Sequence, residues 1–147
     1  MDPDETLPDA IRHAGWTPQP ENTIPDDERM TAAELRVIRE FLSLTGDVLA
    51  ALLGVDPRTV RHWEAGKYRI PDSVRITVEQ LEEMTGRAVA DTVNQLARLE
   101  EPGVIVYRTD ADYQRAQPAT TMPASWHRAV VARAALEVPG LAMDYAT

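Results

Sequence analysis

The chain of 147 residues contains no cysteine, which excludes disulfide bonds and metal sites built from thiolates. Its three histidines, His13, His62 and His127, are far apart and lack the spacing of metal ligands. No apolar run is long enough to cross a membrane, and the acidic first residues do not resemble a signal peptide. These absences predict a cytoplasmic protein without metal, cofactor or membrane partner.

The sequence also lacks the residue patterns of catalytic sites. It shows no defensible Ser/His/Asp or Cys/His spacing, and the acid pairs Glu82-Glu83 and Glu100-Glu101 fall at exposed positions of a predicted helix. Gly66-Lys67 is not a phosphate-binding loop, because no glycine lies five residues before Gly66. We therefore expect no catalytic residues and no enzymatic activity.

The net charge of −9 is distributed unevenly along the chain. Residues 1–29 hold eight acidic and two basic residues together with five prolines, a composition that predicts an acidic disordered tail. Residues 56–71 hold four basic and two acidic residues. Because salt screens charges over about 8–10 Å, the overall charge does not prevent this second segment from binding nucleic acid.

The middle of the chain predicts two short helices joined by a tight turn. We expect the first helix over Gly46–Leu53 and the second over Pro57–Ala65. Gly54 permits the positive φ that such a turn requires, Asp56 is a good N-cap, and Pro57 suits the first helical position. The apolar positions that this pair must bury are Leu49, Leu53, Val55, Val60 and Trp63.

The spacing within this pair resembles a known DNA-binding motif. Counted from Gly46, a small residue falls at position five, glycine at nine, a β-branched residue at fifteen and a large apolar residue at eighteen. With W-E-A-G-K at 63–67, this spacing resembles the helix-turn-helix of the phage repressor/Cro (Xre-type) family. The resemblance implies that the second helix enters the major groove of double-stranded DNA. The alternative is a helical hairpin inside another kind of bundle.

The second helix carries polar side chains that we expect to face outward while Val60 and Trp63 face inward. Arginine pairs bidentately with guanine, and threonine can contact the methyl group of thymine. The residues expected to read bases are Arg58, Thr59, Arg61 and His62. The residues expected to contact phosphates are Thr45, Lys67, Tyr68 and Arg69. Glu64 is expected to be a structural partner of a nearby arginine instead of a reader of cytosine.

The flanking segments predict further helices and one strand. Thr31 and Glu34 form a capping box before a helix whose apolar stripe is Leu35, Ile38, Phe41 and Leu42. A long helix is expected over Asp72–Glu100, either continuous or slightly broken at Thr85-Gly86. A strand over Val104–Tyr107 is followed by helices over Asp110–Arg115 and Pro123–Leu136. The lone strand needs a partner, either the same strand of a second subunit or a segment that the pattern does not reveal.

These segments extend the resemblance beyond the helix-turn-helix. The start M-T-x-x-E-L-x-x-I-R from Met30, the I-P-D at 70–72, the V-I-V-Y strand and the helix opening at Ser125-Trp126 look like a phage and bacterial subgroup that includes anti-CRISPR-associated transcriptional regulators. The resemblance implies dimeric repressors of their own operons, held together by a C-terminal unit. The residues expected at the dimer interface are Val104, Val106, Trp126, Val130 and Ala134.

The sequence therefore predicts a mainly α fold in three parts: an acidic tail over 1–29, a helix-turn-helix domain of four to five helices over 30–101, and a small C-terminal α+β dimerisation unit over 102–147. The predicted function is a sequence-specific DNA-binding transcriptional regulator, a dimeric repressor at an inverted repeat. Two alternatives stay open: an antitoxin that grips a toxin through residues 104–147, and an RNA-binding regulator that uses the same basic face.

Overall fold

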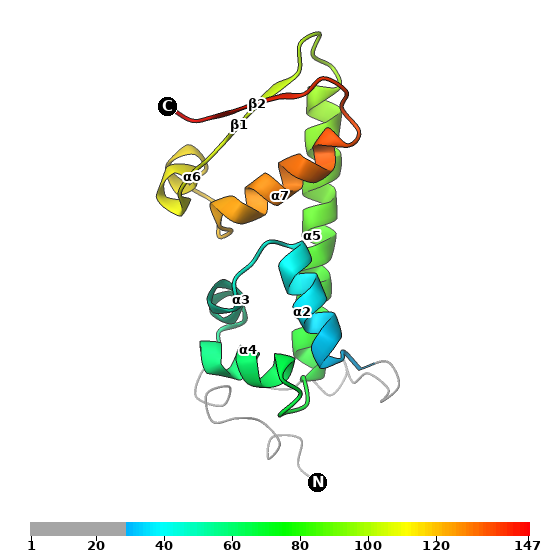
Figure 1. Cartoon of the computed structure of the whole chain (residues 1–147), viewed down its shortest axis with the longest axis vertical. Helices are drawn as coiled ribbons and strands as arrows, with labels where there is room; N and C mark the ends of the chain where they lie inside the picture. The colour runs from blue at the N-terminus through cyan, green and yellow to red at the C-terminus, as the bar shows by residue number, and fades with distance from the viewer. Residues whose placement is uncertain (1–28) are drawn as a thin grey trace. The chain divides into compact units, whose positions relative to one another are not determined.

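The computed structural model describes residues 29–147 (Figure 1), so all of the predicted acidic tail except Arg29 lies outside the described residues. The described part forms six helices and two short strands in the order α2, α3, α4, α5, β1, α6, α7, β2. It divides into two compact units, one ending at Glu82 and the other running from Glu83 to Thr147, and α5 contributes to both. The prediction of a mainly helical chain is confirmed.

The first unit contains α2 (Ala32–Phe41), α3 (Gly46–Leu53), α4 (Pro57–Glu64) and the first part of α5 (Asp72–Leu96). Side-chain caps determine where the first three helices begin, because each satisfies a backbone N–H that the helix itself leaves free. The caps are Thr31, Thr45 and Asp56, which accept hydrogen bonds from the N–H groups of Glu34, Val48 and Arg58.

The core of the first unit comes from all four helices and the loop after α2. Its largest fully buried side chains are Leu35, Leu42, Leu49, Val60, Trp63, Val74 and Val78. The prediction that Phe41 belongs to the buried apolar stripe of α2 is wrong, since Phe41 is 55% exposed. The helix ends at Phe41, and the buried apolar positions continue instead at Leu42 and Leu44 in the loop that follows.

The second unit contains the rest of α5, β1 (Gly103–Val106), α6 (Asp110–Ala116), α7 (Ala124–Ala135) and β2 (Ala142–Tyr145). The two strands lie side by side and parallel, with Val104 opposite Met143 and Val106 opposite Tyr145. The predicted strand therefore has its partner in the same chain, in a segment that the sequence pattern did not reveal. The other option, pairing with the same strand of a second subunit, is not what the structure shows for β1.

Helix α5 is continuous through Thr85-Gly86 and ends at Leu96, before the predicted end at Glu100. Thr85 is buried, and its hydroxyl oxygen accepts a hydrogen bond of 2.9 Å from the indole Nε1 of Trp126. Gly86 lowers the stability of the helix by about 1 kcal/mol relative to alanine, and this tertiary contact at Thr85 favours the helix at the same place. It also joins the second half of α5 to α7, so the division between the units falls within α5, earlier than the predicted boundary at residue 101.

The residues predicted for a dimer interface lie inside the second unit. Trp126, Val130 and Ala134 are buried, and Val104 and Val106 are half-buried in β1, which contacts α7. Burial contradicts the expectation for Trp126, Val130 and Ala134, because the apolar stripe of α7 covers elements of its own chain. For the half-buried Val104 and Val106, contact with a second subunit stays a prediction. The exposed apolar side chains of the sheet are instead Ile105, Met143 and Tyr145, at 45%, 47% and 44%.

Candidate nucleic-acid interface

Helices α3 and α4 are joined by the tight turn that the sequence predicts. Gly54 has a left-handed conformation with φ 71°, and its N–H donates to the carbonyl oxygen of Ala51. The N–H of Val55 donates to the carbonyl oxygen of Ala50 at 2.9 Å, which closes the last turn of α3. Asp56 then caps α4, with Pro57 at its first position. The predicted bounds of α3 are confirmed, and α4 ends one residue before the predicted Ala65.

Helix α4 has one buried face and one exposed face. Thr59, Val60 and Trp63 are buried, whereas Arg58 and Arg61 are exposed. The expectation that Thr59 reaches outward is wrong, since its side chain is only 2% exposed. Helical periodicity explains this result: Thr59 lies four residues before the buried Trp63 and therefore on the same face.

Among the described residues of the first unit, some exposed cations have a carboxylate partner and others have none. Within residues 29–147, Arg58, Arg61 and Lys67 have no carboxylate partner within ion-pair distance. Arg69, by contrast, lies 3.7 Å from the carboxylate of Asp72. Among the described residues, no ion pair has to be broken before Arg58, Arg61 or Lys67 can bind an anionic ligand.

His62 occupies the last turn of α4 and is half-buried. Partial desolvation, followed by the positive charges of Lys67, Arg58 and Arg61, lowers the pKa of His62 below its ordinary value. The imidazole is consequently neutral near pH 7 and carries one N–H donor and one nitrogen acceptor. The ring of Tyr68 packs edge-on against it, with 5.4 Å between the ring centroids.

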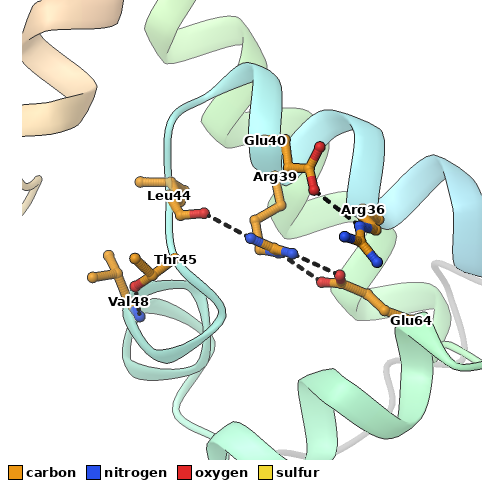
Figure 2. A network of polar contacts seen from close by, with 7 residues as sticks. All are labelled: Arg36, Arg39, Glu40, Leu44, Thr45, Val48 and Glu64. Carbon is orange, nitrogen blue, oxygen red and sulfur yellow. Dashed lines mark hydrogen bonds and ion pairs between the residues drawn. The ribbon is translucent and has the colours of Figure 1, made fainter.

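Thr45 is the N-cap of α3 (Figure 2). Its hydroxyl oxygen accepts a hydrogen bond of 3.1 Å from the N–H of Val48. The side chain is at an exposed position, so the hydroxyl hydrogen can still be donated to a phosphate oxygen beside the helix N-terminus. Contact with phosphate stays a prediction for this residue, as it does for Lys67, Tyr68 and Arg69.

Arg39 connects α2, the loop after it and α4 (Figure 2). Its Nε and Nη2 donate to the two carboxylate oxygens of Glu64 at 2.7 and 2.8 Å, and its Nη1 donates to the carbonyl oxygen of Leu44 at 3.0 Å. The two side chains are 16% and 11% exposed. The hydrogen bonds and charge of Glu64 raise the pKa of Arg39 despite its partial burial.

This bidentate pair confirms Glu64 as the structural partner of an arginine. The arginine itself, Arg39, was not predicted from the sequence, although its position in α2 carries a signal. Arg39 lies four residues after the buried Leu35 and so on the inward side of α2, where a charged residue requires a partner. The pair fixes the end of α4 to α2 and thereby the direction in which α4 presents its exposed face.

A comparison with families of known proteins bears on this geometry. The model of the family described as Aca2/YdiL-like matches residues 30–142. The chain belongs to the Aca2/YdiL-like family. The match agrees with the resemblance to anti-CRISPR-associated transcriptional regulators and extends from the first described helix into β2. A search of curated proteins found no match.

The family match reaches both units of the chain, since it covers the α3–α4 pair, β1 and the first residue of β2. Among residues 29–147, no group of three or more His, Asp or Glu side chains has the geometry to hold a metal ion. In the same part of the chain, no helix is both long and apolar enough to span a bilayer.

Proposed function

We propose that this member of the Aca2/YdiL-like family is a sequence-specific DNA-binding transcriptional regulator that acts as a dimeric repressor. The observation that carries the proposal is the outer face of α4, where Arg58 and Arg61 are exposed and lack a carboxylate partner among the described residues. The buried Val60 and Trp63 anchor the opposite face of the same helix. Under this proposal the protein is not an enzyme.

In the proposed mechanism, α4 enters the major groove. Arg58 and Arg61 donate bidentately to O6 and N7 of guanine, each pair giving about 1–3 kcal/mol of discrimination against other bases. His62 reads a neighbouring base edge through its neutral imidazole. Backbone contacts position the protein without reading sequence, and they are assigned to Thr45, Lys67, Tyr68 and Arg69. Bound at a promoter, the protein blocks access of the polymerase.

The proposed dimer uses the exposed apolar residues of the β1–β2 sheet, Ile105, Met143 and Tyr145. A sheet of two four-residue strands is marginal by itself, and β2 is exposed along its whole length. We assign this surface to a second copy of the chain, because a single eight-residue recognition helix reads only one half-site. Two copies place two α4 helices in successive major grooves, about 34–36 Å apart.

The experiment that tests the proposal is selection of bound fragments from random duplex DNA with the purified full chain. We expect enrichment of an inverted repeat whose half-sites are separated by about 10 bp or a multiple of it. Competition with hairpin RNA is measured in parallel. Absence of any enriched duplex contradicts the proposal, and preferential displacement by RNA indicates an RNA-binding regulator instead. A neighbour-encoded protein that co-purifies and masks the sheet indicates an antitoxin.

A further inference from the structure

The segment after α4 turns back onto the helix that it leaves. Gly66 has φ 74°, the N–H of Gly66 donates to the carbonyl oxygen of Trp63 at 3.1 Å, and that of Lys67 donates to the carbonyl oxygen of His62 at 2.9 Å. This pair of bonds is the Schellman motif that ends helices at a left-handed glycine. Its consequence here is that Tyr68 lies beside the last turn of α4.

Tyr68 contacts two neighbours through its ring. The ring is edge-on to the imidazole of His62, at a centroid distance of 5.4 Å and an interplanar angle of 61°. The Nζ of Lys67 lies 5.6 Å from the centroid of the same ring. Edge-to-face packing is a favoured geometry for aromatic pairs, and a cation over an aromatic ring is attracted by its quadrupole.

Within residues 29–147, the side chain of His62 has no hydrogen bond or ion pair, so the ring of Tyr68 is the specific contact that restrains it. Orientation is important for this residue because a neutral imidazole is asymmetric. One ring nitrogen donates and the other accepts, and base edges in the major groove differ in their order of donors and acceptors. A freely rotating imidazole can satisfy more than one base pair, whereas a fixed one discriminates between them.

We infer that Tyr68 is a positioning residue for base recognition, whose ring holds the imidazole of His62 in one orientation on the outer face of α4. This role goes beyond a phosphate contact, since it depends on the ring of Tyr68 and not on its hydroxyl group. The inference rests on the proposed function, because it requires that α4 reads DNA.

The test compares the full chain with His62→Ala, Tyr68→Ala, Tyr68→Phe and the double variant His62→Ala/Tyr68→Ala. Affinity is measured for the selected operator and for duplexes that change one base pair at a time. We expect His62→Ala to flatten the preference at one base pair. Tyr68→Ala flattens the preference at that same base pair by about threefold to tenfold, the range of an aromatic pair. The double variant loses no further preference, and Tyr68→Phe retains it.

A structural measurement without DNA supports the same test. The ring current of Tyr68 shifts the imidazole proton resonances of His62, and we expect Tyr68→Ala to abolish this shift and Tyr68→Phe to keep it.

Lys67→Ala is the matched control for the DNA-binding assay. It removes the other neighbour of the Tyr68 ring and lowers affinity for all duplexes without changing base preference.

Three outcomes overturn the inference: Tyr68→Ala keeps the preference at the base pair read by His62, the two alanine effects multiply independently, or His62→Ala changes no preference at all. These outcomes are distinct from failure of the proposed function. If the proposed function is wrong, the parent protein shows no preference among duplexes, and Arg58→Ala and Arg61→Ala have no effect on binding.

Discussion

At the scale of single residues, the six arginines between residues 36 and 75 fall into two groups. Arg36, Arg39 and Arg75 each have a carboxylate within 3 Å, and Arg69 lies 3.7 Å from one. Arg58 and Arg61 have none among the described residues. An internal partner must be displaced before an arginine can bind a base, so the two arginines without one are best suited to direct recognition.

The first prediction follows from this difference. Arg58→Ala or Arg61→Ala weakens operator binding by about 1–3 kcal/mol and relaxes preference at particular base pairs. Lys67→Ala weakens binding to all duplexes alike and reduces the slope of log affinity against log salt by about one. Arg36→Ala is the control, because that guanidinium already pairs with Glu40. Unchanged affinity and base preference in both α4 variants would show that other residues read the operator.

The second prediction concerns His127, whose ring packs against those of Tyr107 and Tyr113 at centroid distances of 5.5 and 4.9 Å. Burial, and then the charge of Arg128, lowers the pKa of His127. In the unfolded chain, His127 binds a proton with the ordinary histidine pKa of about 6.5, at a pH where His127 of the folded chain stays neutral. Stability that is fully present above that pH is therefore lost as the pH falls toward the lowered pKa.

Thermal unfolding between pH 7.5 and pH 5 measures this effect. We expect the melting temperature of the parent to fall more on acidification than that of His127→Phe, which keeps an aromatic ring against the two tyrosines but cannot bind a proton. His62 is present in both proteins, so the difference between the two profiles isolates His127. Superimposable profiles would exclude a contribution from its titration.

At the scale of elements, the Arg39–Glu64 pair connects α2 to the end of α4. Removal of one partner leaves the other charge partly buried and unpaired, which costs more than loss of an exposed ion pair. We predict a coupling of about 1–3 kcal/mol in the double-mutant cycle of Arg39→Met and Glu64→Gln, measured by denaturant unfolding.

The matched control is the Arg36–Glu40 pair within α2, which Figure 2 shows beside it. That pair is exposed and four residues apart, so its coupling is expected to be about 0.2–0.5 kcal/mol. Equal couplings for the two cycles would mean that the Arg39–Glu64 pair does not determine how α4 is held.

Elements that depend on local signals were predictable from the sequence. The caps Thr45 and Asp56, the left-handed Gly54 and the bounds of α3 follow from residues close to each other in the chain. Strand β2 was missed because Ala142–Tyr145 contains no β-branched residue and is extended only by pairing with β1.

The errors at single positions have a similar origin. The 3.6-residue period places Thr59 on the face of Trp63, so the burial of Thr59 is predictable from the sequence. The buried state of Trp126 could not be separated from a dimer interface, because an apolar stripe does not reveal which surface covers it. The site residues Arg58, Arg61 and Thr45 follow from the motif, whereas Arg39 requires the three-dimensional contact.

At the scale of the whole molecule, the fourth prediction concerns assembly. Met143→Lys with Tyr145→Lys places charge on an exposed apolar surface and leaves the buried core unchanged. We expect the full chain to change from dimer to monomer in light scattering and its affinity for the complete operator to fall, because each copy then binds one half-site. Leu136→Lys is the control, since Leu136 is 87% exposed in the same unit but outside the sheet. A double variant that stays dimeric would assign the interface to another surface.

Within residues 29–147, each compact unit buries one indole ring, Trp63 in the first and Trp126 in the second, and these two differ in their environment. The N–H of Trp126 donates to Thr85, whereas that of Trp63 has no hydrogen-bond partner within the described residues. In a Trp16→Phe background, replacing either ring by phenylalanine leaves a single fluorophore that reports on one unit. Coincident emission changes in denaturant would mean that both halves of α5 melt as one cooperative system, and separate changes would give each unit its own free energy of unfolding.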